Sequence, residues 1–132
     1  MPPPPDELFD AGFYRRFYLN PRTRVVTRAE MSRRADLIAA FVRHADFPVR
    51  TILDVGCGLG LMRAQFRRRF PQATYTGLEA SPYLCERHGW THGSAATFAS
   101  ARPFDLVVCH DVLQYLEARE ADAALRNLGR LC

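Results

Sequence analysis

The residues best suited to chemistry in this chain are three glycines that alternate with other residues directly after an aspartate. Asp54 is followed by Gly56, Gly58 and Gly60. Glycine has no Cβ, so it permits positive φ angles and lets a ligand approach the backbone closely. A helix that begins after such a loop also directs free N–H groups into the same space. The pattern therefore predicts a loop that holds a thin or flat part of a ligand.

The spacing of the glycines separates two kinds of nucleotide site. Dinucleotide-binding loops follow the pattern G-x-G-x-x-G, whereas this loop reads G-x-G-x-G. A phosphate-binding loop of the Walker type is excluded, because it needs a lysine and this chain has none. Glu79 follows the loop by ~20 residues, the distance at which a carboxylate can accept hydrogen bonds from both ribose hydroxyls. The spacing favours a nucleoside ligand other than a dinucleotide.

Three segments resemble motifs of the class I S-adenosylmethionine-dependent methyltransferases. Residues 52–60 resemble the first motif, residues 76–81 the acidic end of the second strand, and residues 104–116 the fourth-strand segment. The resemblance implies that S-adenosylmethionine is the cofactor. It also implies that Asp54 helps to hold the methionine end, that Gly56 and Gly58 line it, and that Glu79 binds the ribose. The further contacts expected from the same motifs are Cys57, Gly60, Ala80 beside the adenine, and Cys109 facing the methionine part.

The chain departs from the family pattern after the third strand. Many members carry an acidic residue there that receives the adenine amino group, whereas this chain has Ser94 and Ala95. A serine hydroxyl can accept one hydrogen bond, but it is a weaker acceptor than a carboxylate. We keep Ser94 and Ala95 as expected adenine contacts.

An aromatic stripe precedes the motifs. Phe9, Phe13 and Phe17 recur at a spacing of four, with Tyr14 and Tyr18 beside them, which predicts one aromatic face of a helix over residues 8–19. Packing on the protein core is the simpler interpretation. The alternative is that Tyr14 or Phe17 touches the ligand, since related enzymes often cover the cofactor with an N-terminal segment.

His110 and Asp111 are the candidate catalytic residues. They directly follow the expected fourth strand, and open α/β sheets bind their ligands at that end of the strands. Either could act as a base where the methyl acceptor has a proton to lose. The alternative is a structural loop in which Asp111 caps the next turn.

The methyl acceptor is expected to be a small molecule. Enzymes of this family that methylate amino groups of nucleic acids commonly carry Asn or Asp, then Pro-Pro and an aromatic residue, after the fourth strand, and this chain has Cys-His-Asp-Val at residues 109–112. An RNA or protein acceptor is a weaker alternative. A cofactor-binding or interaction module without catalysis also remains open.

Hydrophobic periodicity predicts the elements that position these residues. Strands are expected at 51–55, 73–79, 90–93 and 104–109, and helices at 8–19, 29–45, 61–70, 82–88 and 117–131. In helix 61–70 the core side is expected to be Leu61, Ala64, Phe66 and Phe70, with Arg63, Arg67, Arg68 and Arg69 in solvent. This alternation predicts an α/β fold, a three-layer Rossmann-like parallel sheet with helices on both faces and strand order 3-2-1-4.

The predicted organisation has three parts. Residues 1–7 read as a disordered proline-rich tail, residues 8–47 as N-terminal helices that form a cap or substrate region, and residues 48–132 as the cofactor-binding core. The family sheet usually has seven strands, so a core of four strands would be incomplete at its C-terminal end. The fourth strand is then expected at an open edge, through which a homodimer could form.

Composition bounds the function further. The charge of +4 comes from 18 arginines, which are dispersed among acidic residues, so nucleic acid is an unlikely partner. Without lysine, Schiff-base catalysis is excluded. Cys57, Cys85, Cys109 and Cys132 lack the close spacing of a metal site. The absence of a signal sequence and of a long apolar run predicts a cytoplasmic protein without a membrane partner.

Overall fold

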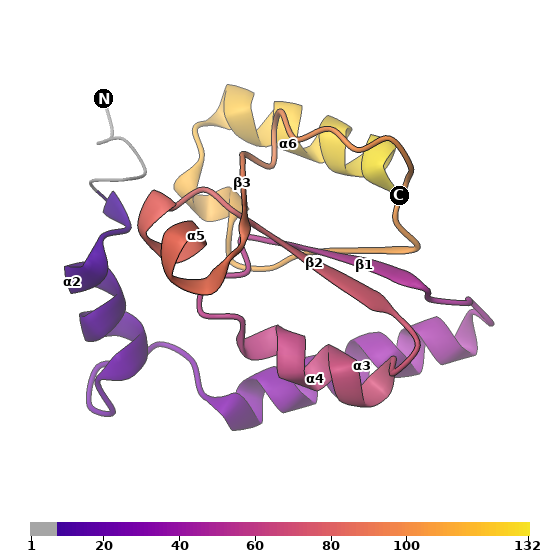
Figure 1. The fold of residues 1–132 in the computed structure, drawn as a ribbon, viewed down its shortest axis with the longest axis horizontal. Coiled ribbons are helices and arrows are strands. Elements are labelled where there is room, and N and C mark those ends of the chain that lie inside the picture. The colour runs from indigo at the N-terminus through magenta and orange to yellow at the C-terminus, as the bar shows by residue number, and fades with distance from the viewer. Residues whose placement is uncertain (1–7) are drawn as a thin grey trace.

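A parallel four-stranded sheet forms the centre of the computed structural model, which describes residues 8–132. The strand order is β3-β2-β1-β4, which confirms the predicted order (Figure 1). Within the described residues β4 pairs with β1 alone, so its other edge is open. The strands are β1 (Thr51–Val55), β2 (Thr74–Glu79), β3 (Thr91–His92) and β4 (Leu106–Cys109).

Helices cover both faces of the sheet, as predicted. Helices α3 and α4 lie together on one face, and α6 lies on the other (Figure 1). The helical elements are α2 (Ala11–Tyr14), the π-helical turn η1 (Arg15–Leu19), α3 (Arg28–His44), α4 (Leu61–Arg69), α5 (Pro82–His88), the 3₁₀ turn η2 (Leu113–Tyr115) and α6 (Ala118–Leu131).

Strand β1 explains the three layers, because its successive side chains point to opposite faces. Ile52 packs in a cluster with Ala35 of α3 and Phe66 of α4. Leu53 packs in a second cluster with Ala124 and Leu131 of α6. Both Ile52 and Leu53 are fully buried, so β1 contributes side chains to two hydrophobic cores, one on each face of the sheet.

The ends of two helices follow directly from local sequence. Thr27 caps α3, and its hydroxyl accepts a hydrogen bond from the N–H of Glu30 while the Glu30 carboxylate accepts from the N–H of Thr27. This is the predicted capping box. Helix α5 begins with Pro82 after the Ser81 cap and ends at Gly89, which has a φ of 70°.

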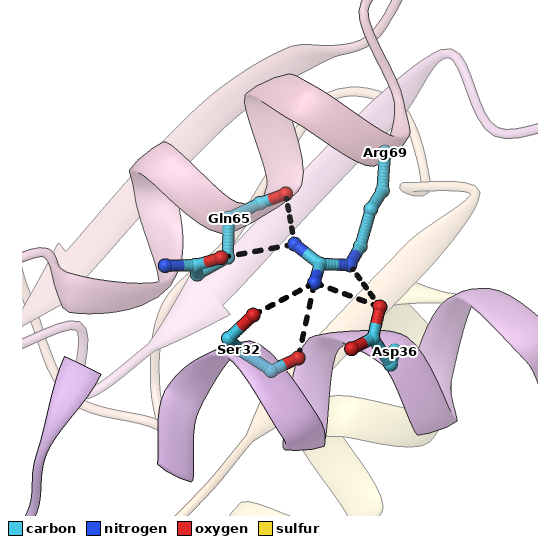
Figure 2. A network of polar contacts seen from close by, with 4 residues as sticks. All are labelled: Ser32, Asp36, Gln65 and Arg69. Carbon is cyan, nitrogen blue, oxygen red and sulfur yellow. Dashed lines mark hydrogen bonds and ion pairs between the residues drawn. The ribbon is translucent and has the colours of Figure 1, made fainter. Parts of the chain in front are cut away.

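Helix α4 corrects two predictions. Its buried residues are Met62, Gln65 and Phe66, whereas Ala64 is exposed, so the expected place of Ala64 in the core was wrong. The small Ala64 side chain offers little apolar area, and the helix turns its longer side chains inward. Arg69 was also misplaced in solvent, because its guanidinium crosses to α3 (Figure 2).

The largest differences from the predicted bounds concern two elements. The expected helix over residues 8–19 is a single α-turn capped by Asp10 that continues as the wider turn η1. The fourth strand begins at Leu106 rather than at 104, because Phe104 donates its N–H to Leu131 and the Asp105 carboxylate accepts the N–H groups of residues 50 and 51. Those contacts take the two residues out of the strand ladder.

Residues 8–132 contain neither a membrane-spanning helix nor a cluster of metal-binding side chains. No helix in this part of the chain is long and apolar enough to cross a membrane. Nor does it contain a group of three or more His, Cys, Asp or Glu side chains placed to hold a metal ion.

Candidate functional site

A cavity of about 320 Å³ lies where the loops after β1, β2 and β4 meet the N-terminal segment. Open α/β sheets place their ligands at this end of the strands. The walls are mostly aromatic and aliphatic, with a few acidic groups. The lining residues are Leu8, Phe9, Phe13, Tyr14, Tyr18, Val55, Gly56, Gly58, Leu78, Glu79, Ala80, Gly93, Ser94, Ala95, Asp111, Val112, Tyr115, Leu116 and Glu120.

The glycine loop forms the floor of the cavity. Gly56, Gly58 and Gly60 all have positive φ angles, of 68°, 54° and 72°. A Cβ on Gly56 would lie 2.3 Å from Cγ2 of Val112, so the Val112 side chain leaves no space for any residue other than glycine. A Cβ on Gly58 would meet nothing closer than a carbonyl oxygen at 4.0 Å. Gly58 therefore keeps open space beside the backbone on the cavity side.

Glu79 connects the glycine loop to the next turn. Its Oε2 accepts a hydrogen bond from the N–H of Gly58 at 2.9 Å, and its Oε1 accepts one from the N–H of Ser81 at 3.0 Å. The side chain is buried yet lines the cavity. A carboxylate has about four acceptor positions, so acceptor capacity remains for a ligand.

Trp90 supports the same loop from the side of β3, a role that the sequence analysis missed. Its Nε1 donates a hydrogen bond to the carbonyl oxygen of Gly58 at 2.9 Å. The indole fills the space beside Gly60 and Gly77, where a Cβ on either glycine would lie 2.7 Å from the ring. Arg63 lies over the ring at 5.4 Å. The loop is thus fixed by a side chain 32 residues away from Gly58.

Asp54 lies below the loop and outside the cavity lining. The Tyr75 hydroxyl donates a hydrogen bond to Oδ2 of Asp54 at 2.5 Å. Burial raises the pKa of Asp54 to about 6, while the Tyr75 hydrogen bond opposes that rise and Glu79 adds to it. Burial likewise raises the pKa of the Tyr75 hydroxyl. The pair forms a buried polar support under the cavity floor.

The N-terminal segment covers the cavity. Tyr14 is 5% exposed, and burial raises the pKa of its hydroxyl, so that group is neutral. The Ser81 hydroxyl donates to the carbonyl oxygen of Phe9 at 2.9 Å, which ties the cover to the β2–α5 turn. Phe9 also packs edge-on against Tyr115 at 5.2 Å. Phe17 does not line the cavity.

The loop after β4 brings together three charged or ionisable groups. Asp111 adopts a φ of 55°, and its Oδ2 lies 3.2 Å from Nδ1 of His110 and 3.9 Å from Nη1 of Arg34. Partial burial lowers the pKa of His110 despite the neighbouring Asp111, and Arg34 lowers it further. His110 is therefore neutral at pH 7. Asp111 lines the cavity, whereas His110 and Arg34 lie outside the lining.

The expected site residues fall into two groups. The first group lines the cavity: Tyr14, Gly56, Gly58, Glu79, Ala80, Ser94, Ala95 and Asp111. The second group lies outside the lining: Asp54, Cys57, Gly60, Cys109 and His110. Cys57 is buried with its sulfur beside Gly77, and Gly60 lies against Trp90.

Several of the lining residues that were not expected from the sequence follow β4. Val112 and Tyr115 follow Asp111 after β4, and Glu120 lies in the first turn of α6. Their position after the fourth strand is the signal that could have found them, because the residues that follow a parallel strand gather at the binding edge.

Comparison with known proteins identifies the family. The family model described as a methyltransferase domain matches residues 53–132 of the sequence. The chain belongs to the methyltransferase domain family. This confirms the resemblance to class I methyltransferases, and it is consistent with the strand order of the sheet.

The chain is similar to curated enzymes over part of their length. It is 28% identical to a trans-aconitate 2-methyltransferase of Pseudomonas paraeruginosa over 71% of this chain and 37% of that protein. It is also 28% identical to a malonyl-[acyl-carrier protein] O-methyltransferase of Halalkalibacterium halodurans, over 77% of this chain and 43% of that protein. The chain thus spans less than half the length of these relatives.

Solved structures agree with the fold. An amino pentose methyltransferase of Micromonospora echinaspora, solved with S-adenosylmethionine bound, is 28% identical with a TM-score of 0.66, over 76% of this chain and 45% of that one. The plantazolicin methyltransferase, in complex with S-adenosylhomocysteine and a monoazolic analogue, is 19% identical. Its TM-score is 0.73, over 94% of this chain and 50% of that one, and at this identity the likeness concerns the fold.

Proposed function

We propose that the cavity binds S-adenosylmethionine and that the protein methylates a small molecule. One observation carries the proposal. The Glu79 carboxylate lies at the end of β2, holds the N–H of Gly58, and still faces the cavity. A buried carboxylate beside an open glycine backbone suits a ribose with two hydroxyl donors. The family and the relatives support this choice of ligand.

The remaining cavity residues fit the cofactor. Gly56 and Gly58 offer backbone without side chains, Ala80 and Ala95 offer flat apolar contact for an adenine, and the Ser94 hydroxyl can accept one hydrogen bond. Tyr14 covers the cavity and excludes water. When bound, S-adenosylmethionine supplies a methyl group activated by a positively charged sulfur. We propose that Cys57, Gly60 and Cys109 shape the loops around it.

Asp54 is proposed to act on the methionine end of the cofactor from beneath the loop. It is ionised at pH 7, since its pKa of about 6 lies below that pH. Its negative charge lies under the glycine loop and favours a positively charged ligand above it. The Tyr75 hydrogen bond fixes its orientation.

Asp111 is the proposed base, with His110 behind it. Asp111 lines the cavity, and its carboxylate can take up a proton released by the acceptor. His110 is neutral at pH 7 and touches the same carboxylate, so it can take up that proton in turn. In this proposal residues 8–47 form the cover and acceptor-selecting region, and residues 48–132 the cofactor-binding core.

The relatives suggest two classes of small-molecule acceptor. Trans-aconitate and malonyl-[acyl-carrier protein] carry carboxylates, and an amino pentose carries an amine. A module that binds the cofactor without transferring a methyl group is the alternative.

Calorimetric titration with S-adenosylmethionine and S-adenosylhomocysteine tests the proposal. We expect both to bind, and we expect Glu79→Gln and Glu79→Ala to raise the dissociation constants at least about tenfold through lost charge-assisted hydrogen bonds. Glu86→Ala is the matched control, since Glu86 is exposed on α5. Circular dichroism checks that each variant is folded. An absence of binding at millimolar cofactor, or full affinity in Glu79→Ala, contradicts the proposal.

A methyl-transfer assay separates the enzyme from the binding module. Release of S-adenosylhomocysteine in the presence of small-molecule acceptors supports the enzyme. Cofactor binding without release in any acceptor mixture supports the module instead.

Association and location complete the proposal. We propose that two copies associate through the open edge of β4, since within residues 8–132 this strand pairs with β1 alone. All four cysteines are free thiols, which supports a cytoplasmic location.

A further inference from the structure

The charged residues that line the cavity all carry the same sign. Glu79, Asp111 and Glu120 line it. The structure describes all 18 arginines and all four histidines of the chain, and none of them lines the cavity. Glu79 is buried, whereas Asp111 and Glu120 are exposed, so water partly screens the charges of the last two. The lining therefore favours a cationic ligand and disfavours an anionic one.

This acidity is built from separate elements. Glu79 ends β2, Asp111 lies in the loop after β4, and Glu120 lies in the first turn of α6. Arg34 comes within 3.9 Å of Asp111 from the side of α3, without lining the cavity. Glu120 forms no ion pair within the described part of the chain. Two carboxylates therefore remain besides Glu79, and the three together exceed the net single positive charge that the sulfonium, ammonium and carboxylate groups of S-adenosylmethionine sum to.

Aromatic rings surround the same space. Phe9, Phe13, Tyr14 and Tyr18 face it from the cover, and Tyr115 faces it from the turn after β4. Aromatic faces attract cations that lie within about 6 Å of the ring centre. Carboxylates together with several rings form the usual protein environment for an ammonium group.

We infer that the methyl acceptor of this site is an amine, bound as its ammonium ion by Asp111, Glu120 and the surrounding aromatic rings. The ammonium ion first passes one proton to the Asp111 carboxylate, because only the neutral amine has the lone pair that accepts a methyl group. The inference rests on the proposed function and decides between the two acceptor classes named there. A carboxylic acid acceptor would add negative charge to a cavity that already holds three carboxylates.

Matched ligands test the charge preference by calorimetry in the protein saturated with S-adenosylhomocysteine. The compounds of one series share a pyranose ring and carry an amine, an alcohol or a carboxylate: glucosamine, glucose and glucuronate. A second keeps a phenyl ring: phenethylamine, phenethyl alcohol and phenylacetate. Trans-aconitate is added as the acid from the curated relatives. We expect the amine to bind at least about tenfold tighter than the alcohol in one series or both, and each acid to bind weakest. A preference for an acid, or no preference in either series, overturns the inference.

Variants test whether Asp111 and Glu120 cause the preference for amines. Asp111→Asn and Glu120→Gln should each lower the amine-to-alcohol affinity ratio several-fold, and together about tenfold. Asp122→Asn makes the same charge change on the outer side of α6, where the side chain is 69% exposed and lies 3.8 Å from Arg126, so it should leave the ratio unchanged. Equal effects of the cavity variants and this control overturn the inference. Protein that fails to bind S-adenosylhomocysteine refutes the proposed function, whereas protein that binds it without preferring amines refutes this inference alone.

Discussion

Asp54 lies buried under the glycine loop, where its ionised form lowers the stability of the folded protein. The Tyr75 hydroxyl donates a hydrogen bond to it. Burial holds the pKa of Asp54 at about 6, above its ordinary value of 3.8, although the Tyr75 hydrogen bond opposes the rise. The folded protein therefore holds this proton more tightly than the unfolded chain. Ionised Asp54 costs stability above pH 6, the cost declines between pH 6 and 4, and it vanishes below that range.

Asp54→Asn should therefore stabilise the protein in a pH-dependent way. Asparagine can still accept the Tyr75 hydrogen bond but carries no charge. Two pH units of displacement correspond to ~3 kcal/mol, so we expect the free energy of unfolding at pH 7.5 to rise by ~1–3 kcal/mol. At pH 4.5 the gain should fall to about a third of that value, because Asp54 is then protonated in the folded protein but still mostly ionised in the unfolded chain. Urea unfolding at both pH values measures it, with Asp122→Asn as the exposed control. A gain that does not depend on pH contradicts the explanation.

At the level of single residues, the sequence predicted what is encoded by spacing along the chain. The glycines and Glu79 follow a pattern of that kind, and the structure places Gly56, Gly58 and Glu79 at the cavity. Trp90 could not be found in this way, because its role depends on a hydrogen bond to Gly58 across the fold. Glu120 was missed although it follows the fourth strand, where residues gather at the binding edge of the sheet.

At the level of elements, one arginine joins the two helices on the same face of the sheet. The guanidinium of Arg69 in α4 donates to the Asp36 carboxylate and to the carbonyl and hydroxyl oxygens of Ser32 in α3, and also to Gln65 (Figure 2). The Arg69 side chain is 15% exposed. Hydrogen bonds to a charged donor are stronger than neutral ones. The network fixes α4, which begins directly after the glycine loop.

Arg69→Leu should lower the free energy of unfolding by ~2 kcal/mol, because the buried Gln65 side chain loses its partner and the α3 contacts are lost. Arg68→Leu is the matched control on the exposed face of the same helix and should change it by less than ~0.5 kcal/mol. Urea unfolding of both variants measures the difference. Equal effects in the two variants would mean that the Arg69 contacts shown in Figure 2 do not stabilise the folded protein.

The elements were predictable where local signals agree. The bounds of β1 and α5 matched the prediction, because β1 ends at a glycine and α5 lies between a Ser-Pro start and Gly89. The start of β4 was mispredicted, because the Asp105 carboxylate binds the N–H groups of residues 50 and 51 across the sheet. No pattern within residues 104–109 contains that contact.

At the level of the whole sheet, β4 pairs with β1 alone within residues 8–132, so its other edge is unpaired there. An apolar groove runs along this strand and is bordered by Ile38, Phe41, Val42 and Phe47. Phe41 is 71% exposed and Phe47 56% exposed. A strand edge with free N–H and C=O groups beside exposed phenylalanines is a site at which another chain can pair.

A second copy of the chain should therefore associate at this edge. In a dimer the two β4 strands extend the sheet and the phenylalanines are buried, whereas a carboxylate in their place would have to be desolvated. Phe41→Glu combined with Phe47→Glu should raise the dimer dissociation constant at least about tenfold in sedimentation equilibrium. Leu125→Glu is the matched control, because Leu125 is 54% exposed on α6, the helix that covers the opposite face of the sheet. A wild-type chain that stays monomeric across the concentration series, or a dimer weakened equally by Leu125→Glu, contradicts association through β4.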